Sequence, residues 1–211
     1  MKREAAIRSA TRFARRLIKP GLLLGVALWS GSPLNTAGAV QVDTEASERA
    51  VAAFNGRVKD YLKLRKKAQA KPSNLSDKSK PEEIEVHMVR LQASISAARG
   101  AAKPGDIFTP DIARVIRRAI RNEFRGERLR KLRETIREAE TKGVAMRANV
   151  PYPETKELIE MPPTLLLNLP VLPEELQYRF VGGYLLLVDK EARLIVDYMA
   201  GAVPRPAKSV R

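Results

Sequence analysis

Apolar residues recur at helical spacing through the middle of the chain and predict three helices there. In the first, over residues 43–70, apolar side chains follow one face while Lys and Arg occupy the others. A second helix is expected over residues 81–100, because Pro81 suits the first turn and glutamates follow it. A third starts at a hydroxyl, proline and acid and runs over residues 109–143, with a bend expected at Gly126. One apolar stripe on each helix predicts a small three-helix bundle or an elongated helical hairpin.

The pattern changes after the helices. The segment NVPYP, residues 149–153, breaks the helical spacing, so it is interpreted as a boundary. Residues 176–181 and 193–199 alternate in polarity, and the stretch between them, 184–188, is apolar throughout, as in a central strand. The Gly182-Gly183 pair suits a tight hairpin turn. A three-stranded antiparallel β-meander over about 176–199 is therefore expected.

Alternation also assigns side chains to the faces of these strands. Tyr178 and Phe180 are expected on one face of the first strand. Leu194, Val196 and Tyr198 are expected on one face of the last. The fold class expected is α+β: a basic helical region, then a proline-rich segment with the meander and a short tail, over residues 40–148 and 149–211.

Residues 1–39 have the composition of an export signal. Seven basic residues and one acid precede a short apolar core, and Ala37 and Ala39 then form an A-x-A cleavage signature. The alternative is an uncleaved membrane anchor, which needs about 20 apolar residues, roughly twice the run present here. We predict cleavage after Ala39 and the periplasm of a Gram-negative bacterium, by the general secretory route. The pair Arg15-Arg16 raises the twin-arginine route as the alternative.

Charge and composition limit the partners. The chain of 211 residues has a net charge of +15 and no cysteine, which excludes disulfides, thiolate nucleophiles and cysteine–zinc sites. Residues 1–39 account for +6 of that charge, so the other 172 residues hold +9. An anionic envelope component or another protein is the expected partner. No nucleic acid partner, no cofactor, no metal and no transmembrane span in the mature chain are expected.

No catalytic constellation is recognisable, so a non-enzymatic protein is predicted. His87 is the only histidine, and its place between apolar residues indicates a core or boundary position and neither a ligand nor a general base. Asp189 follows the second strand pattern, and Asp197 lies within the third. They are expected to hold the turn and to solvate the sheet edge.

The third helix carries the most basic surface. Five arginines face a single acid, Glu123, between residues 114 and 125, and we name them the arginine face: Arg114, Arg117, Arg118, Arg121 and Arg125. One hypothesis is that they bind an anionic surface or acidic partner. The other is that they form a solvated helix face without a ligand.

The C-terminal pattern YRFVGGYLLLVD…LIVD also resembles the hairpin of the periplasmic nickel/cobalt-efflux regulator family. The longer run from Met161 to Asp197 resembles the C-terminal segment of small exported bacterial proteins of uncharacterised function. The resemblance covers about a fifth of the chain and implies an exported protein with metal-linked regulation. This chain has one histidine and no cysteine for such a role.

Three functions are consistent with the sequence. The first is an exported envelope protein that binds an anionic surface or an acidic partner through the arginine face. The second is a periplasmic chaperone-like or scaffolding protein. The third, based on the resemblance alone, is a metal-responsive periplasmic regulator.

Overall fold

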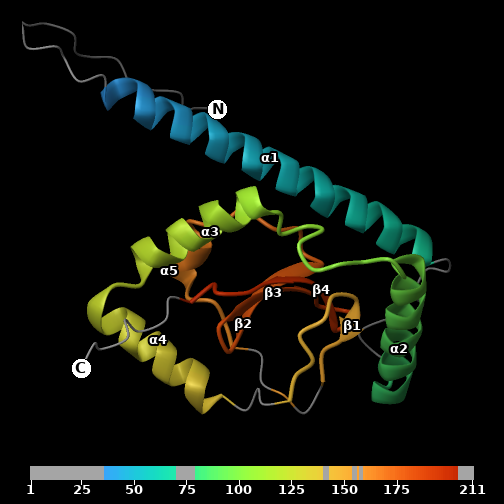
Figure 1. Cartoon of the computed structure of the whole chain (residues 1–211). Helices are drawn as coiled ribbons and strands as arrows, with labels where there is room; N and C mark the ends of the chain where they lie inside the picture. The colour runs from blue at the N-terminus through green and yellow to red at the C-terminus, as the bar shows by residue number, and fades with distance from the viewer. Residues whose placement is uncertain (1–35, 70–78, 140–142, 154–155, 157–158, 204–211) are drawn as a thin grey trace, which may run out of the picture. The chain divides into compact units, whose positions relative to one another are not determined.

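The computed structural model describes residues 36–69, 79–139, 143–153, 156 and 159–203, with backbone alone for 36–42. Thr36–Arg211 forms one compact unit. Its described residues form helices and one antiparallel sheet, which confirms the α+β prediction (Figure 1). The helices are α1 (Thr36–Ala68), α2 (Pro81–Ala98), α3 (Pro110–Glu123), α4 (Gly126–Glu138) and α5 (Pro163–Leu166). The strands are β1 (Val150–Pro151), β2 (Leu176–Val181), β3 (Tyr184–Asp189) and β4 (Leu194–Met199).

The sheet has four strands in the order β1-β4-β3-β2, so the prediction of three strands was one short. The added strand, β1, lies in the NVPYP segment and pairs antiparallel with the start of β4. Asn149, at φ 63°, precedes it and donates through Nδ2 to the carbonyls of Ser96 and Arg99, at 2.9 and 3.1 Å. These carbonyls belong to the end of α2, which leaves them without helical partners. Asn149 therefore fixes the NVPYP segment to that helix end.

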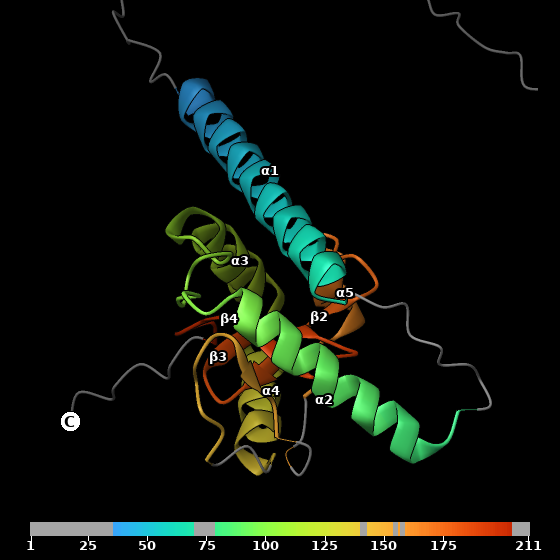
Figure 2. The same ribbon diagram turned by 90° about the vertical axis from the view of Figure 1, so that its right-hand side faces the viewer.

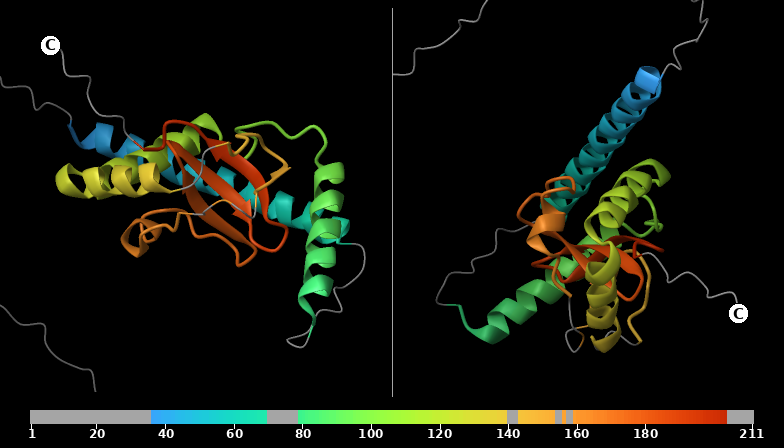
Figure 3. Two further views of the ribbon diagram at one scale, coloured as in Figure 1. Left: turned by 90° about the horizontal axis from the view of Figure 1, so that it is seen from below. Right: turned by 90° about the vertical axis from the view of Figure 1, so that its left-hand side faces the viewer.

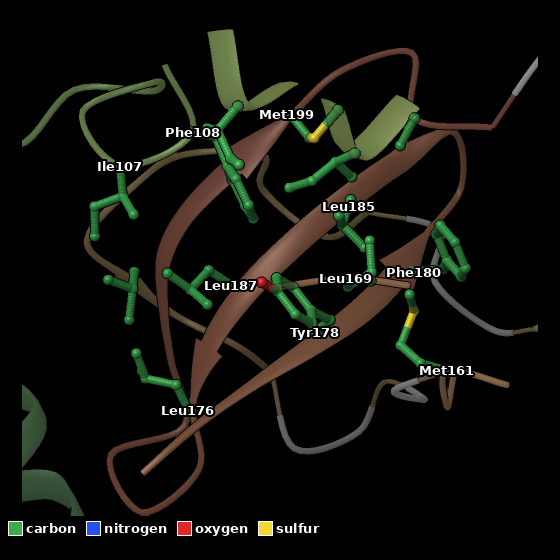
Figure 4. Close-up of a cluster of buried hydrophobic side chains, with 14 of the residues drawn as sticks. Ile107, Phe108, Met161, Leu169, Leu176, Tyr178, Phe180, Leu185, Leu187 and Met199 are labelled. Carbon is green, nitrogen blue, oxygen red and sulfur yellow. The ribbon is translucent and has the colours of Figure 1, made fainter. Parts of the chain in front are cut away.

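The two faces of the sheet are buried by different parts of the chain. On one face, Tyr178, Phe180, Leu185 and Leu187 lie together in a buried apolar cluster (Figure 4). This cluster is part of a single core that includes residues from all five helices. On the other face, a smaller cluster forms around Leu186, with Tyr152, Val188 and Ile195. The predicted positions of Tyr178 and Phe180 on one face of β2 are confirmed. The helices thus share their core with the sheet.

The helices contribute unequally to that core. α1 buries Phe54, Val58 and Tyr61, at the spacing that the sequence indicated. α2 buries only Leu91 and Ile95 in its second half, and Figure 2 shows its first half extending away from the sheet. Ile84, in that first half, is about half exposed, so the apolar stripe expected along this helix is buried only in its second half. None of the helices among the described residues is long and apolar enough to cross a membrane.

A β-bulge changes the faces of β4. Leu187 pairs with Asp197 and the next residue, Val188, pairs with Ile195, so Val196 has no partner across the ladder. Leu194, Val196 and Asp197 consequently all lie on the helix-covered side. Strict alternation would instead place Leu194 and Asp197 on opposite faces of the sheet. Tyr198 falls on the opposite side, next to Tyr184. The prediction that it shares a face with Leu194 and Val196 was wrong, because period-two counting does not include the extra residue.

The predicted third helix is two helices. α3 ends at Glu123, Phe124 adopts an extended conformation that buries its ring, and α4 begins at Gly126, whose φ is +52°. The predicted bend at Gly126 is therefore a break. Figure 3 shows α4 leaving the end of α3 in a new direction, with α5 beside α3.

Candidate functional site

Asp189 is the centre of a buried polar network between α1 and the β3–β4 turn. Its carboxylate is fully buried; Oδ2 accepts hydrogen bonds from the Tyr61 hydroxyl at 2.8 Å and from Arg65 Nε at 2.7 Å. Its Oδ1 accepts from the backbone N–H of Ala192 at 2.9 Å and holds the turn closed. Tyr61 and Arg65 lie one helical turn apart in α1 and reach the same oxygen. The network fixes α1 to the sheet.

Glu191 extends this network to α2 and to the surface. Its carboxylate pairs with the Arg65 guanidinium through Oε2, and its Oε1 lies 2.8 Å from His87 Nε2. Gln92, also on α2, donates to the Ala192 carbonyl at 3.0 Å. His87 is mostly buried at the edge of the body, in agreement with the predicted boundary position. One turn of the sheet thereby contacts two helices.

Burial and charge set the protonation states in the network. Burial and the adjacent Asp189 carboxylate raise the pKa of the Tyr61 hydroxyl, so Tyr61 remains a hydrogen-bond donor. Burial lowers the pKa of Arg65, but the Asp189 and Glu191 carboxylates together outweigh it, and the pKa lies above its ordinary value. Partial burial raises the pKa of Glu191, but hydrogen bonds with His87 and Arg65 outweigh it and hold the pKa below the ordinary 4.5.

Acidification is expected to destabilise the protein through Glu191. Because its pKa is lower folded than unfolded, its contribution is present above about pH 4.5 and is lost as pH falls through the folded pKa. Urea unfolding midpoints, measured from neutral pH to about pH 3, should fall more steeply for the wild type than for Glu191→Gln. Parallel curves for the two proteins would contradict this role.

Asp197, the second buried carboxylate, holds the loop between α2 and α3. Its Oδ2 accepts from the backbone N–H groups of Ile107 and Phe108, at 2.8 and 2.7 Å. Its Oδ1 accepts from those of Gly105 and Tyr198, both at 2.8 Å. Four backbone donors therefore converge on one fully buried side chain. The bulge in β4 places this carboxylate on the helix-covered face.

The prediction that Asp189 and Asp197 solvate the sheet edge was wrong, because both are fully buried. Only the turn-holding role was correct, and only for Asp189. The signal available in the sequence was an aspartate directly after a run of apolar residues, in LLLVD and LIVD. Such a position is buried when helices cover that part of the sheet. A strand pattern alone does not reveal that cover.

The arginine face lies on the exposed side of α3 and on the turn after it. Arg118 forms a bidentate pair with Asp43 of α1, at 2.6 and 3.0 Å, and Arg114 pairs with Asp111 at 2.5 Å. Arg117 donates to the Ala200 carbonyl at 2.9 Å. Two of the five arginines of the arginine face therefore pair with carboxylates.

The remaining two arginines are near the C-terminal end of α3. Arg125 donates to the Asn122 side-chain amide at 2.9 Å, and Arg121 is exposed. Within the described residues neither has a carboxylate partner. Glu123, the single acid between residues 114 and 125, pairs with Arg128 at 3.2 Å and accepts a hydrogen bond from the Thr164 hydroxyl at 2.8 Å. Arg117, Arg121 and Arg125 are therefore the cations of the arginine face without a carboxylate partner among the described residues.

Other sequence expectations fall partly outside the described residues. Residues 1–35 of the predicted signal peptide, 1–39, lie outside them, and Ala37 and Ala39 lie in the first turn of α1, of which only the backbone is described. No group of three or more His, Cys, Asp or Glu side chains that could hold a metal occurs in the described part of the chain.

Comparison with known proteins adds no function: no family model, no curated protein and no solved structure matches this chain.

Proposed function

We propose that this protein is an exported, non-enzymatic envelope protein that binds an anionic surface through the C-terminal end of α3. The observation that carries the proposal is the group of three exposed or half-exposed arginines, Arg117, Arg121 and Arg125, that lack carboxylate partners in the described structure. Guanidinium groups bind phosphate and carboxylate oxygens in a forked geometry. The composition of residues 1–39 supports export.

The rigidity of α3 supports this proposal. Ile112, Ile116 and Ile120 are fully buried, so the helix presents its opposite face to solvent in a fixed orientation. The pairs made by Arg114 and Arg118 are solvent-exposed, and such pairs contribute little to stability. An anionic ligand can therefore compete for these arginines at small cost. Asp111 and Asp43 limit the affinity at that end of the helix.

The double variant Arg121→Gln, Arg125→Gln is expected to lose roughly tenfold or more in affinity for vesicles that contain phosphatidylglycerol. Each basic residue near such a surface contributes about 1 kcal/mol at low salt. Vesicle cosedimentation at about 50 mM salt measures the affinity, which should fall further as salt screens the charges.

The matched control is Lys66→Gln, Lys67→Gln, which removes the same charge from two exposed lysines at the end of α1. Equal losses in both variants would indicate a response to net charge alone and would contradict a site on α3. Absence of binding by the wild type to any anionic surface would reject the proposal.

A chaperone-like or scaffolding role is the second candidate, favoured by exposed apolar residues on α2. Ile84, Val86 and Val89 are each about half exposed on the first half of this helix. Large apolar side chains grouped on a surface mark sites of protein interaction. Suppression of the aggregation of an unfolded client, lost in Val86→Ser with Val89→Ser and unaffected by the arginine variant, would support this candidate. Unchanged client aggregation would reject it.

A further inference from the structure

The segment from Met161 to Pro173 contains no charged residue and presents three large apolar side chains to solvent. Leu167 and Val171 are 87% and 89% exposed, and Leu166 is 45% exposed. They are the most exposed large apolar side chains among the described residues of the C-terminal half, and we name them the apolar tip. Figure 3 shows the segment, in orange, projecting from the sheet. Large apolar side chains that are grouped and exposed in this way mark an interaction site.

The apolar tip is held rigidly by its neighbours. Leu165 and Leu169 are buried in the main core on either side of the exposed leucines. The Asn168 side chain donates to the Thr164 carbonyl at 2.9 Å, and the Tyr178 hydroxyl donates to the Pro170 carbonyl at 3.1 Å. Four prolines further restrict the backbone. A surface that is already ordered loses little conformational entropy when a partner covers it.

The apolar tip lies beside the C-terminal end of α3. α5 contacts α3, and the Thr164 hydroxyl donates to Glu123 at 2.8 Å. Glu123 also pairs with Arg128, so its charge is compensated where the two segments meet. Arg121 and Arg125 flank Glu123 in sequence. The nearest acids in sequence, Glu160 and Glu174, lie at the two ends of the segment, where the chain joins the sheet edge at β2.

Resting on the proposed function, we propose that the anionic surface is a phospholipid membrane and that the apolar tip inserts at its interface. Apolar side chains enter the boundary between head groups and acyl chains, while adjacent arginines contact the anionic head groups. A soluble anionic polymer offers the arginines the same charge but nothing to cover Leu167 and Val171. The combination of both features on adjacent elements favours a membrane over such a polymer.

The test compares two ligands of the purified full chain: vesicles of phosphatidylglycerol and phosphatidylcholine, and soluble inorganic polyphosphate. Leu167→Ser with Val171→Ser should weaken vesicle binding roughly tenfold, on the basis of the apolar area removed, and leave polyphosphate binding unchanged. Val86→Ser with Val89→Ser, on α2, is the matched control and should change neither. Because every variant contains residues 1–39, any contribution of that segment cancels.

A second readout uses the absence of native cysteine. A polarity-sensitive fluorophore on Leu167→Cys should shift to shorter wavelength with vesicles, whereas one on Asp60→Cys, in α1, should not. Equal vesicle affinity of the serine variant, or no shift at position 167, would overturn insertion while the proposed function stands. Binding to polyphosphate without binding to vesicles would do the same. Binding to neither ligand would overturn both proposals.

Discussion

Asp197→Ala should lower the free energy of unfolding by about 3–6 kcal/mol, because four backbone N–H groups lose their acceptor. Three of them belong to the α2–α3 loop, and Ile107 and Phe108 place their side chains in the main core. Loss of the acceptor therefore loosens the packing as well as the loop. For a domain with a total stability of about 5–15 kcal/mol, this loss is severe. Urea denaturation measures it.

Two further variants make the Asp197 result interpretable. Asp197→Asn retains one acceptor oxygen and replaces the other with a donor, so it should lose an intermediate amount of stability. Asp60→Ala removes a carboxylate whose side chain is 75% exposed, and should cost less than about 0.5 kcal/mol. A loss below about 1 kcal/mol in Asp197→Ala would show that water replaces the carboxylate and that the loop does not depend on it.

Asp189→Ala should cost about 3–5 kcal/mol, because it leaves the buried Arg65 guanidinium and the Tyr61 hydroxyl without their shared acceptor. The Arg65 side chain is 8% exposed and the site of Asp189 is fully buried, so water cannot readily compensate the guanidinium charge that remains. The Glu191 carboxylate still pairs with Arg65 in this variant, so the loss of stability should lie toward the lower end of this range. Thermal or urea unfolding provides the measurement.

A double-mutant cycle separates the pair from the burial of its members. The coupling energy between Arg65 and Asp189, from Arg65→Met, Asp189→Ala and their combination, should exceed about 1 kcal/mol. The matched cycle on Lys63 and Asp60, an exposed pair at 3.2 Å, should give less than about 0.5 kcal/mol. Similar coupling in both cycles would mean that the buried pair does not fix α1 to the sheet.

The positions of β2, β3 and β4 and the starts of α2 and α3 could be predicted from local patterns. Pro81 and Pro110 begin helices as expected, because proline suits the first turn and local geometry decides this. Thr109 occupies the N-cap position, but its side chain makes no capping hydrogen bond. The glycine turn between β2 and β3 is also where the sequence placed it. These features depend on neighbours within a few residues.

The arrangement of the candidate site could not be predicted in the same way. The pair between Arg118 and Asp43 joins residues 75 positions apart, so no local spacing reveals it. It divides the arginine face, which is uniform in the sequence. The arginines of this face that have no carboxylate partner among the described residues lie toward the C-terminal end of α3. The exposure of Leu167 likewise depends on which leucines of the apolar run pack into the core, and local spacing does not reveal this.

The sequence by itself determined that this chain forms basic helices followed by a β-meander, because helical and strand periods are properties of neighbouring residues. Only the tertiary structure decided that the helices share their core with the sheet and that Asp189 and Asp197 are buried. The physical reason is the bulge at Val196 together with the covering helices. One added residue moves Asp197 to the covered face, and burial then requires that hydrogen bonds satisfy its carboxylate.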